Sequence, residues 1–381
     1  MRGCAKLRSI TCSISSDSIL LWKEWEVTLL GLVGLVFLLA WWATGRLCTP
    51  GSCLHLLDHP NARSLHEVPT PRTGGLALLG SVAVGLLLAT LWEVPTKAWW
   101  LGSPQTPPMA GLWILGMTFL LALVSFWDDR GGLPVSFRFG VQLIAAAVVV
   151  IGVGITFSFI IMPIVGSVQL GWVAVPVTLL FLLWMTNLYN FMDGMDGFAG
   201  GMTVIGCGFM AYFAWKAGHE FILVSALLLS VASAGFLVHN FPPAKIFMGD
   251  VGSVASGFLC GALIILGCRD RVFDFWVPVI LFSPFILDAT ATLVWRAWQR
   301  EKIWVAHRTH YYQRLVLSGW GHRKAVLAEY AVMVLCGGFA LLYQYASEEW
   351  RLVILGFWGV LFLSLALAVK GIEQRIQPVG S

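Results

Sequence analysis

The chain has 381 residues, of which 58% are hydrophobic and only 12% are charged, and its formal net charge is +4. Soluble domains carry about 25% charged residues, so this composition excludes an ordinary soluble protein. The apolar runs are long and continuous rather than alternating, which favours membrane-spanning helices over a β-barrel.

Apolar segments with the length of a spanning helix, about 20 residues, recur along the whole chain. In chain order, helices are expected at residues 26–44, 73–92, 110–127, 139–156, 171–187, 198–217, 220–238, 251–267, 273–296, 324–345 and 350–369. The apolar stretch 157–170 is expected to form an interfacial hairpin or a further short span. We therefore predict an all-α, polytopic integral membrane protein with about eleven transmembrane helices.

The predicted organisation is one membrane domain with two tails. Residues 1–25 are expected to form an N-terminal tail, which could be disordered. Residues 26–369 are expected to form the single transmembrane domain, and residues 370–381 a cytoplasmic tail. The N-terminal tail lacks the apolar core of a cleaved signal peptide. Its first 20 residues are either native or the product of an upstream start codon.

Basic residues gather on one side of the predicted membrane domain. The odd-numbered loops and the C-terminal tail carry Arg46, Arg63, Arg72, Arg130, Arg138, Lys245, Arg296, Arg300, Lys302, Arg308, Arg314, Arg323, Lys324, Lys370 and Arg375. The opposite loops carry only Lys97, Lys216, Arg269, Arg271 and Arg351. The positive-inside rule therefore predicts that the odd-numbered loops face the cytoplasm, although the basic residues of the N-terminal tail contradict it.

One segment combines carboxylates, carboxamides and glycines at the end of an apolar run. It reads Asn187-Leu-Tyr-Asn190-Phe-Met-Asp193-Gly-Met-Asp196-Gly. Charge at the edge of a bilayer is costly, so such a cluster indicates a polar ligand, an ion or a reaction. The two aspartates are spaced i, i+3, which places them on one face if this segment is helical.

The other odd-numbered loops carry clusters of their own, whereas the even-numbered loops carry nothing comparable. The clusters are Pro60-Asn-Ala-Arg-Ser-Leu-His66 with Pro69–Gly75, then Asp128-Asp129-Arg130, then His239–Ser253, which contains Gly249-Asp250-Val-Gly252-Ser253, and finally His307-Arg-Thr-His310-Tyr-Tyr-Gln-Arg314. This one-sidedness predicts a composite site on the cytoplasmic face.

The residue types indicate the chemistry of that site. The aspartates that border it are Asp128, Asp129, Asp193, Asp196, Asp250 and Asp288. Unpaired carboxylates repel one another unless a cation intervenes, and ligands that are all oxygens favour Mg²⁺ or Mn²⁺ over zinc. The cations available for phosphate oxygens are Arg72, Lys245, Arg308 and Arg314. Together these groups predict phosphoryl-group transfer at the membrane surface.

Purely structural interpretations remain open for part of this set. Asp288 lies within an expected helix and Arg296 follows near its end, so the two residues could form a structural ion pair, or Asp288 could be a polar residue that faces the helix bundle. Gly74 and Gly75 could serve close helix packing instead of substrate approach.

The joint set of motifs resembles the polyprenyl-phosphate N-acetylhexosamine-1-phosphate transferases, which include the phospho-MurNAc-pentapeptide translocase. The resemblance covers roughly residues 58–315 and depends on Asp128-Asp129, Asn187–Gly197 and Phe247-Met-Gly-Asp-Val-Gly-Ser253. It implies that a lipid phosphate attacks the β-phosphorus of a UDP-sugar and releases UMP. The implied partners are a UDP-N-acetylhexosamine, polyprenyl phosphate and the bacterial plasma membrane. No nucleic acid is expected, and a homodimer is left open.

The resemblance also implies roles for individual residues. It makes Asp250 the magnesium ligand and Asp128 the base that deprotonates or positions the lipid phosphate, and Asp129 is implied to assist the metal or the phosphate. The nucleotide side is implied to contain Asn187, Asn190, Asp193 and Asp196, with Arg72, Lys245 and Arg308 as further substrate-binding residues. His307 and His310 match the histidine motif that contacts the sugar-phosphate end. A two-step route through an aspartyl-phosphate remains an alternative.

Loop nine distinguishes branches within the family. The peptidoglycan translocase pattern calls for three consecutive histidines, whereas this chain has His307-Arg-Thr-His310. We therefore expect the branch that initiates O-antigen, as part of lipopolysaccharide and cell wall biogenesis, with peptidoglycan precursor synthesis as the alternative. From a different class, a transporter would place its charges near mid-bilayer, and an inert scaffold would not need all these aspartates.

Overall fold

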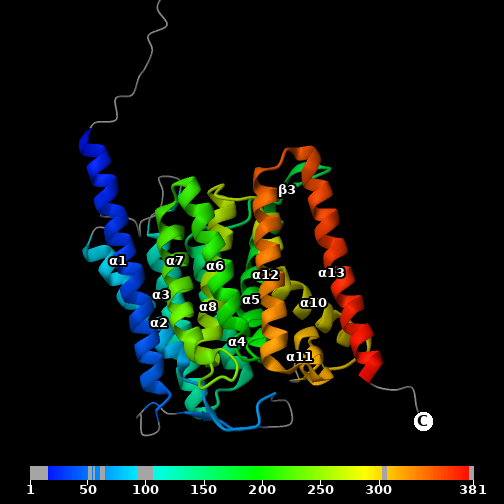
Figure 1. Ribbon diagram of the computed structural model, residues 1–381. Helices are drawn as coiled ribbons and strands as arrows, with labels where there is room; N and C mark the ends of the chain where they lie inside the picture. Colours follow the sequence, from blue (N-terminus) through cyan, green and yellow to red (C-terminus); the bar gives the residue numbers. More distant parts are fainter. Residues whose placement is uncertain are drawn as a thin grey trace, which may run out of the picture.

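The computed structural model describes residues 16–49, 54, 56–60, 65–92, 106–107, 109–302 and 307–376, with side chains described between residues 27 and 375 of these ranges. Residues 1–15 of the predicted N-terminal tail and Asn61–Ser64 of the first loop motif therefore lie outside the described residues. The described chain is mainly helical (Figure 1). Its helices include α1 (Ser16–Leu47), α2 (Gly74–Leu91), α3 (Ala110–Gly131), α4 (Val135–Ala147), α5 (Ala174–Met192), α6 (Phe198–Ala217), α7 (Glu220–Asn240), α8 (Gly249–Arg269), α9 (Trp276–Leu281), α10 (Ser283–Trp298), α11 (Tyr311–Leu315), α12 (Gly321–Tyr345) and α13 (Glu348–Ile376).

The predicted class, an all-α polytopic membrane protein, is confirmed. Within the described residues, 10 helical segments are long and apolar enough to cross a membrane. The segment expected at 273–296 differs from a simple span because it is divided into α9 and α10. Pro284 lies at the start of α10, where its missing N–H costs nothing and its fixed φ suits the first helical turn.

Residues 157–170, for which the sequence allows either a hairpin or a further short span, form a hairpin. Strand β3 (Phe159–Met162) pairs antiparallel with β4 (Gly166–Gln169), with Phe159 opposite Gln169. The hairpin is attached to α9 because Trp276 Nε1 donates a hydrogen bond of 3.0 Å to the Ile161 carbonyl. A shorter antiparallel pair, β1 (Leu57–Asp58) and β2 (Thr70–Pro71), lies in the loop between α1 and α2.

Helix α8 forms the centre of the bundle. It is buried along its whole apolar length and contacts α2, α3, α5, α6 and α7, whereas α1 and α13 lie at opposite edges (Figure 1). Close approach to α5 depends on small residues: a Cβ on Gly257 would lie 2.7 Å from the Met185 carbonyl oxygen. In a membrane the hydrophobic effect does not drive helices together, so their association depends on the close packing that small residues at the interface permit.

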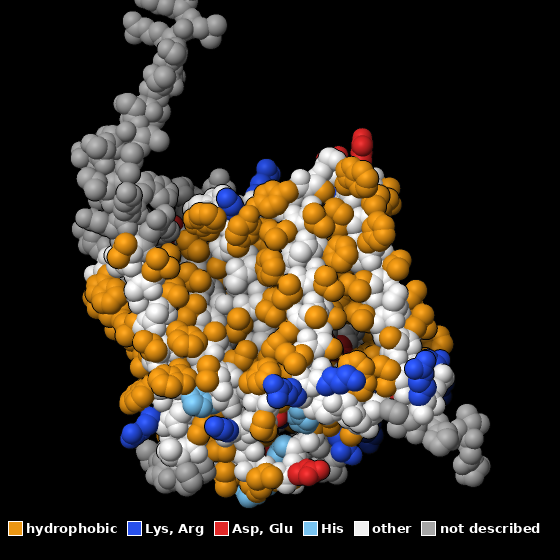
Figure 2. Space-filling view, viewed as in Figure 1, with side chains coloured by type: hydrophobic (Ala, Val, Ile, Leu, Met, Phe, Trp, Pro, Cys, Tyr) orange, Lys and Arg blue, Asp and Glu red, His pale blue; other side chains and the backbone are white. Residues whose placement is uncertain are grey.

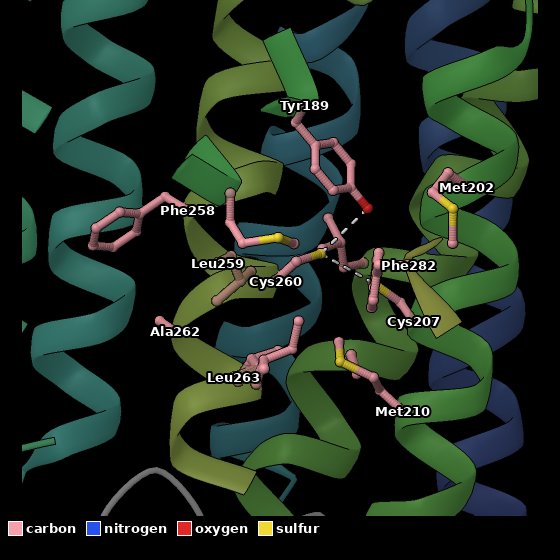
Figure 3. Packing of buried hydrophobic residues seen from close by; sticks show 14 of the residues in the cluster. Tyr189, Met202, Cys207, Met210, Phe258, Leu259, Cys260, Ala262, Leu263 and Phe282 are labelled. Atoms are coloured by element: carbon pink, nitrogen blue, oxygen red, sulfur yellow. Dashed lines mark hydrogen bonds between the residues drawn. The ribbon is translucent and has the colours of Figure 1, made fainter. Parts of the chain in front are cut away.

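The core between α5, α6 and α8 includes a small polar contact among apolar side chains (Figure 3). The sulfur atoms of Cys207 and Cys260 lie 3.5 Å apart, and the Cys260 thiol lies 3.6 Å from the Tyr189 hydroxyl. Tyr189 is fully buried, and this contact gives its oxygen a partner. The packing holds the end of α5 that carries Asn187 and Asn190.

Charged side chains lie mainly at the two ends of the bundle, with a broad apolar belt between them. On the face shown in Figure 2, Lys, Arg and His side chains gather at the lower end, where α1 ends and α11 lies. An apolar belt of this kind is the surface that lipid tails contact.

Candidate active site

A cavity of about 790 Å³ opens at the end of the bundle where α3 and α5 end and α8 begins. Its lining contains most of the predicted site residues, namely Arg72, Asp128, Asp129, Asn187, Asn190, Asp193, Asp196, Asp250, His307 and His310. These residues come from all five of the predicted clusters. The cavity also contains residues that the sequence did not single out for the site, among them Arg138, Gln142, Gln313 and His322.

The two consecutive aspartates lie at the end of α3, and both are buried. Asp128 Oδ2 accepts a hydrogen bond of 2.8 Å from Arg138 Nη1, and its Oδ1 accepts one of 2.6 Å from the Leu133 amide. Asp129 Oδ1 lies 3.5 Å from Arg72 Nη1. The chain turns directly after these residues because Gly132 adopts a left-handed φ of +66°. Each aspartate therefore has its own arginine.

Arg138 also connects α3 to α8. Its Nη1 lies 3.4 Å from Asp250 Oδ2 as well as 2.8 Å from Asp128 Oδ2, so one guanidinium group bridges both carboxylates. Asn190 Nδ2 donates to Asp250 Oδ1 at 2.8 Å and to Ser253 Oγ at 3.2 Å. In the sequence, Arg138 is one of the basic residues of the odd-numbered loops. It belongs to no motif, and only its position 10 residues after Asp128 relates it to the site.

Asn187 faces a different neighbour from Asn190. Its Nδ2 donates to Gln142 Oε1 at 2.9 Å and to the Leu183 carbonyl at 2.8 Å. Asn187 and Asn190 line the same cavity wall, one turn apart on α5. The helix thus orients both carboxamides toward the cavity.

The start of α8 is positioned by the first loop. The Phe247 amide donates to the Pro71 carbonyl at 2.7 Å, and the amides of Gly74 and Gly75 donate to the carbonyls of Phe247 and Met248 at 2.9 and 2.8 Å. A Cβ on Gly75 would lie 2.3 Å from the Gly252 nitrogen. The structural interpretation of Gly74 and Gly75 is therefore correct: they permit close packing that fixes where Asp250 lies.

Negative charge exceeds positive charge around Asp193, which directly follows α5. Burial raises the pKa of Asp193 well above its usual value, and the neighbouring carboxylates Asp250 and Asp129 raise it further. Asp196 differs because its partners are local: Oδ2 accepts from the Ala244 amide at 3.0 Å and Oδ1 lies 3.0 Å from His322 Nδ1. Asp193 is thus the carboxylate for which an added cation would relieve repulsion.

The two predicted histidines lie together, with ring centroids 4.7 Å apart. Burial, followed by the charge of His310, lowers the pKa of His307 to about 4. His310 is buried, and its Nδ1 lies 3.2 Å from Asp288 Oδ1. The proposed ion pair between Asp288 and Arg296 is wrong, because Arg296 pairs with Glu301 at 2.9 Å, while Asp288 faces His310.

Some predicted cations lie away from the cavity. Lys245 and Arg308 are exposed and are not among the lining residues, and Arg314 binds Glu373, with Nε 2.6 Å from Oε1. In the described part of the chain, the arginines that line the cavity are Arg72, Arg130 and Arg138. Positive charge at the cavity thus comes from the first and third loops and from α4.

The donor atoms fit a hard cation. Among the described residues, no group of three or more His, Cys, Asp or Glu side chains could hold a metal ion alone. Mg²⁺ in phosphoryl-transfer sites is usually held by one or two carboxylates, with substrate phosphates and water as its other ligands. Asp250 supplies such an oxygen, and Asp128 lies close by, since the Oδ2 atoms of both residues contact Arg138. The residues present therefore fit Mg²⁺ or Mn²⁺ bound together with a diphosphate.

Comparison with known proteins gives a consistent result. The model of the family "Glycosyl transferase family 4" matches residues 112–268. A probable undecaprenyl-phosphate N-acetylglucosaminyl 1-phosphate transferase of Bacillus subtilis is 30% identical over 327 residues, which is 84% of this chain and 87% of the relative. The decaprenyl-phosphate N-acetylglucosaminephosphotransferase of Mycolicibacterium smegmatis is 32% identical over 330 residues, or 80% of this chain and 79% of the relative.

A phospho-N-acetylmuramoyl-pentapeptide-transferase of Acetivibrio thermocellus matches a shorter stretch. It is 32% identical over 230 residues, which is 57% of this chain and 64% of the relative. The family match and the two long alignments agree with the motifs that converge on the cavity. The chain therefore belongs to glycosyl transferase family 4, the polyprenyl-phosphate N-acetylhexosamine-1-phosphate transferases.

Proposed function

We propose that the protein transfers N-acetylhexosamine 1-phosphate from a UDP-sugar to polyprenyl phosphate at the cytoplasmic face of a bacterial plasma membrane, with UDP-N-acetylglucosamine as the first substrate to test. The observation that carries the proposal is the single cavity in which carboxylates, carboxamides, arginines and histidines of five separate segments meet. Its position at the end of a transmembrane bundle suits a reaction between a soluble nucleotide and a lipid.

The reaction exchanges one phosphoanhydride bond for another. A phosphate oxygen of the lipid attacks the β-phosphorus of the UDP-sugar, the bond from that phosphorus to the bridging oxygen breaks, and UMP leaves with this oxygen. Bound Mg²⁺ or Mn²⁺ would supply charge neutralisation for the diphosphate and the departing UMP. Phosphoryl transfer depends mainly on positioning and electrostatic stabilisation, which is what the protein groups of the cavity provide.

The contacts suggest a different role for each of these groups. Asp250, oriented by Asn190 at 2.8 Å, would hold the metal, and Asp128 would position or deprotonate the lipid phosphate. Arg138 contacts both carboxylates, so its guanidinium group lies between them and would bind phosphate oxygens there. Asp129 would assist the metal or phosphate.

We assign the nucleotide and the sugar phosphate to different residues of the cavity lining. Asn187, Asp193 and Asp196 lie beside Asn190 on the wall assigned to the nucleotide. His307 and His310, which line the same cavity, would contact the sugar phosphate. Arg72 is the remaining lining cation among the predicted substrate-binding residues, whereas Lys245 and Arg308 would need to move to reach a substrate.

Relatives of two kinds define the alternatives for the sugar. Those with the long alignments are named for N-acetylglucosamine 1-phosphate transfer to undecaprenyl or decaprenyl phosphate. The relatives named for phospho-N-acetylmuramoyl-pentapeptide transfer match less of the chain, between 57% and 71%. This difference supports initiation of a surface glycan over a peptidoglycan precursor, and assignment to O-antigen in particular remains a prediction.

The test uses the purified full-length protein in detergent with undecaprenyl phosphate and MgCl₂. UDP-N-acetylglucosamine, UDP-FucNAc, UDP-QuiNAc and UDP-MurNAc-pentapeptide, each labelled in the sugar, are supplied separately. We expect UMP release and transfer of label to the lipid with one UDP-hexosamine and loss of both on adding EDTA. Absence of turnover with every nucleotide sugar would refute the proposal.

A further inference from the structure

We propose that Asp288 is a positioning residue for His310, an inference that rests on the proposed function. Asp288 lies on α10, outside every motif on which the family resemblance depends, and it is buried. Its Oδ1 lies 3.2 Å from His310 Nδ1 and accepts from the Tyr311 amide at 2.9 Å. Its Oδ2 accepts from the Tyr312 amide at 3.1 Å. One carboxylate thus holds the histidine ring and the first turn of α11.

This contact decides which ring nitrogen carries the proton. A carboxylate oxygen opposite Nδ1 favours the tautomer with a proton on Nδ1, which donates to Asp288. Nε2 is then the nitrogen that retains its lone pair. Because His310 lines the cavity, Nε2 is available to a substrate oxygen or proton.

The orientation of the ring is fixed by further contacts. His310 stacks on Tyr312, with centroids 5.8 Å apart and planes inclined by 13°. The Tyr312 hydroxyl donates to the Phe191 carbonyl at 3.2 Å, and Phe191 directly follows Asn190 in the acidic segment. Asp288, by binding the Tyr312 amide, therefore connects the histidine to the nucleotide wall of the cavity.

A purely structural role for Asp288 makes different predictions. As a cap for α11 alone, it would be replaceable by asparagine, whose one carbonyl oxygen can still accept from a backbone amide. Asparagine lacks the negative charge and the second acceptor oxygen, so it cannot bind both amides and also the His310 Nδ1–H. Asp288→Asn therefore separates positioning from capping.

The first experiment compares kinetics of the full-length protein in detergent. For Asp288→Asn we expect kcat to fall about 10- to 100-fold, the range typical when the partner that orients a histidine is removed, with the KM for the UDP-sugar within about threefold of the parent. Thr292→Val is the matched control, because Thr292 Oγ1 donates to the same Asp288 oxygen at 3.2 Å and the substitution leaves both the carboxylate and His310 in place. It should retain the parental kcat.

A double-mutant cycle then tests whether Asp288 acts through His310. If it does, Asp288→Asn combined with His310→Ala will be no slower than His310→Ala alone, because the second change removes what the first one orients. Multiplicative losses of kcat in the double variant would overturn the proposal and leave Asp288 with a separate role.

A measurement independent of turnover distinguishes failure of this inference from failure of the proposed function. In ¹⁵N-histidine-labelled full-length protein, the resonances that disappear in His310→Ala report the tautomer of His310. We expect a proton on Nδ1 in the parent and loss of that preference in Asp288→Asn. A parent with the proton on Nε2 would overturn the inference, whereas absent turnover with an Nδ1–H tautomer would count against the proposed function alone.

Discussion

Replacing Gly75 by alanine tests whether helix packing sets the geometry of the cavity. Gly75 does not line the cavity, yet its Cα lies against the first turn of α8. An added Cβ would lie 2.3 Å from the Gly252 nitrogen and 2.6 Å from the Met248 carbonyl oxygen. Both are backbone atoms, so neither can rotate away. The start of α8, which carries Asp250, has to move.

The size of the effect follows from the overlap. The new Cβ lies about 1 Å inside the ordinary contact distance, and overpacking of this kind costs about 1–3 kcal/mol. We expect the upper half of that range because the obstructing atoms are backbone. A displacement of about 1 Å at a catalytic group can lower the rate about 100-fold. Gly75→Ala should therefore lower both the melting temperature and kcat.

The assay combines thermal unfolding in detergent with UMP release under saturating substrate. Gly80→Ala is the matched control, because Gly80 is exposed on the same helix and an added Cβ meets nothing within 4 Å. Alanine is the better helix former by about 0.5–1 kcal/mol, so this control should be neutral or slightly stabilising. Parental melting temperature and parental turnover in Gly75→Ala would refute the packing argument.

Three further predictions concern the cavity itself. Asp250→Asn should abolish turnover at every Mg²⁺ concentration, since the carboxylate that Asn190 orients at 2.8 Å is lost; near-parental rates across a titration would exclude it as the metal ligand. Asp128→Asn should lower kcat more than it weakens UDP-sugar binding, measured by calorimetry, and unchanged kinetics would remove Asp128 from the mechanism. Burial, followed by the charge of His310, lowers the pKa of His307 from 6.5 to about 4. The unfolded state therefore binds a proton more readily than the folded state, and the free energy of unfolding should fall as the pH falls from about 6.5 towards 4. His307→Gln should reduce that acid sensitivity in melting curves between pH 4 and 7, and curves parallel to the parent would contradict it.

The sequence by itself determined the class of the protein and its family, and it predicted most of the residues that line the cavity. Continuous apolar runs admit only helices in lipid, because every backbone group has to find its partner within its own segment. Several helix ends were therefore predictable, and for α6 the expected range, 198–217, is the observed one. Other ends differ more: α1 begins at Ser16 rather than at residue 26, and α13 ends at Ile376 rather than at residue 369. The clusters on alternate loops predicted a common site because alternate loops of a spanning bundle share one side.

Only the tertiary structure decided which side chains face one another. Arg138 belongs to no motif, and it bridges Asp128 and Asp250 because α4 packs against α3 and α5 and its side chain reaches the start of α8. The sequence allows Asp288 to pair with Arg296 on its own helix, yet Asp288 faces His310, which lies 22 residues away along the chain. Helical periodicity relates residues within one element, whereas contacts between elements depend on packing and on loop paths. For the same reason Lys245 and Arg308, which are basic and near motifs, lie outside the cavity lining.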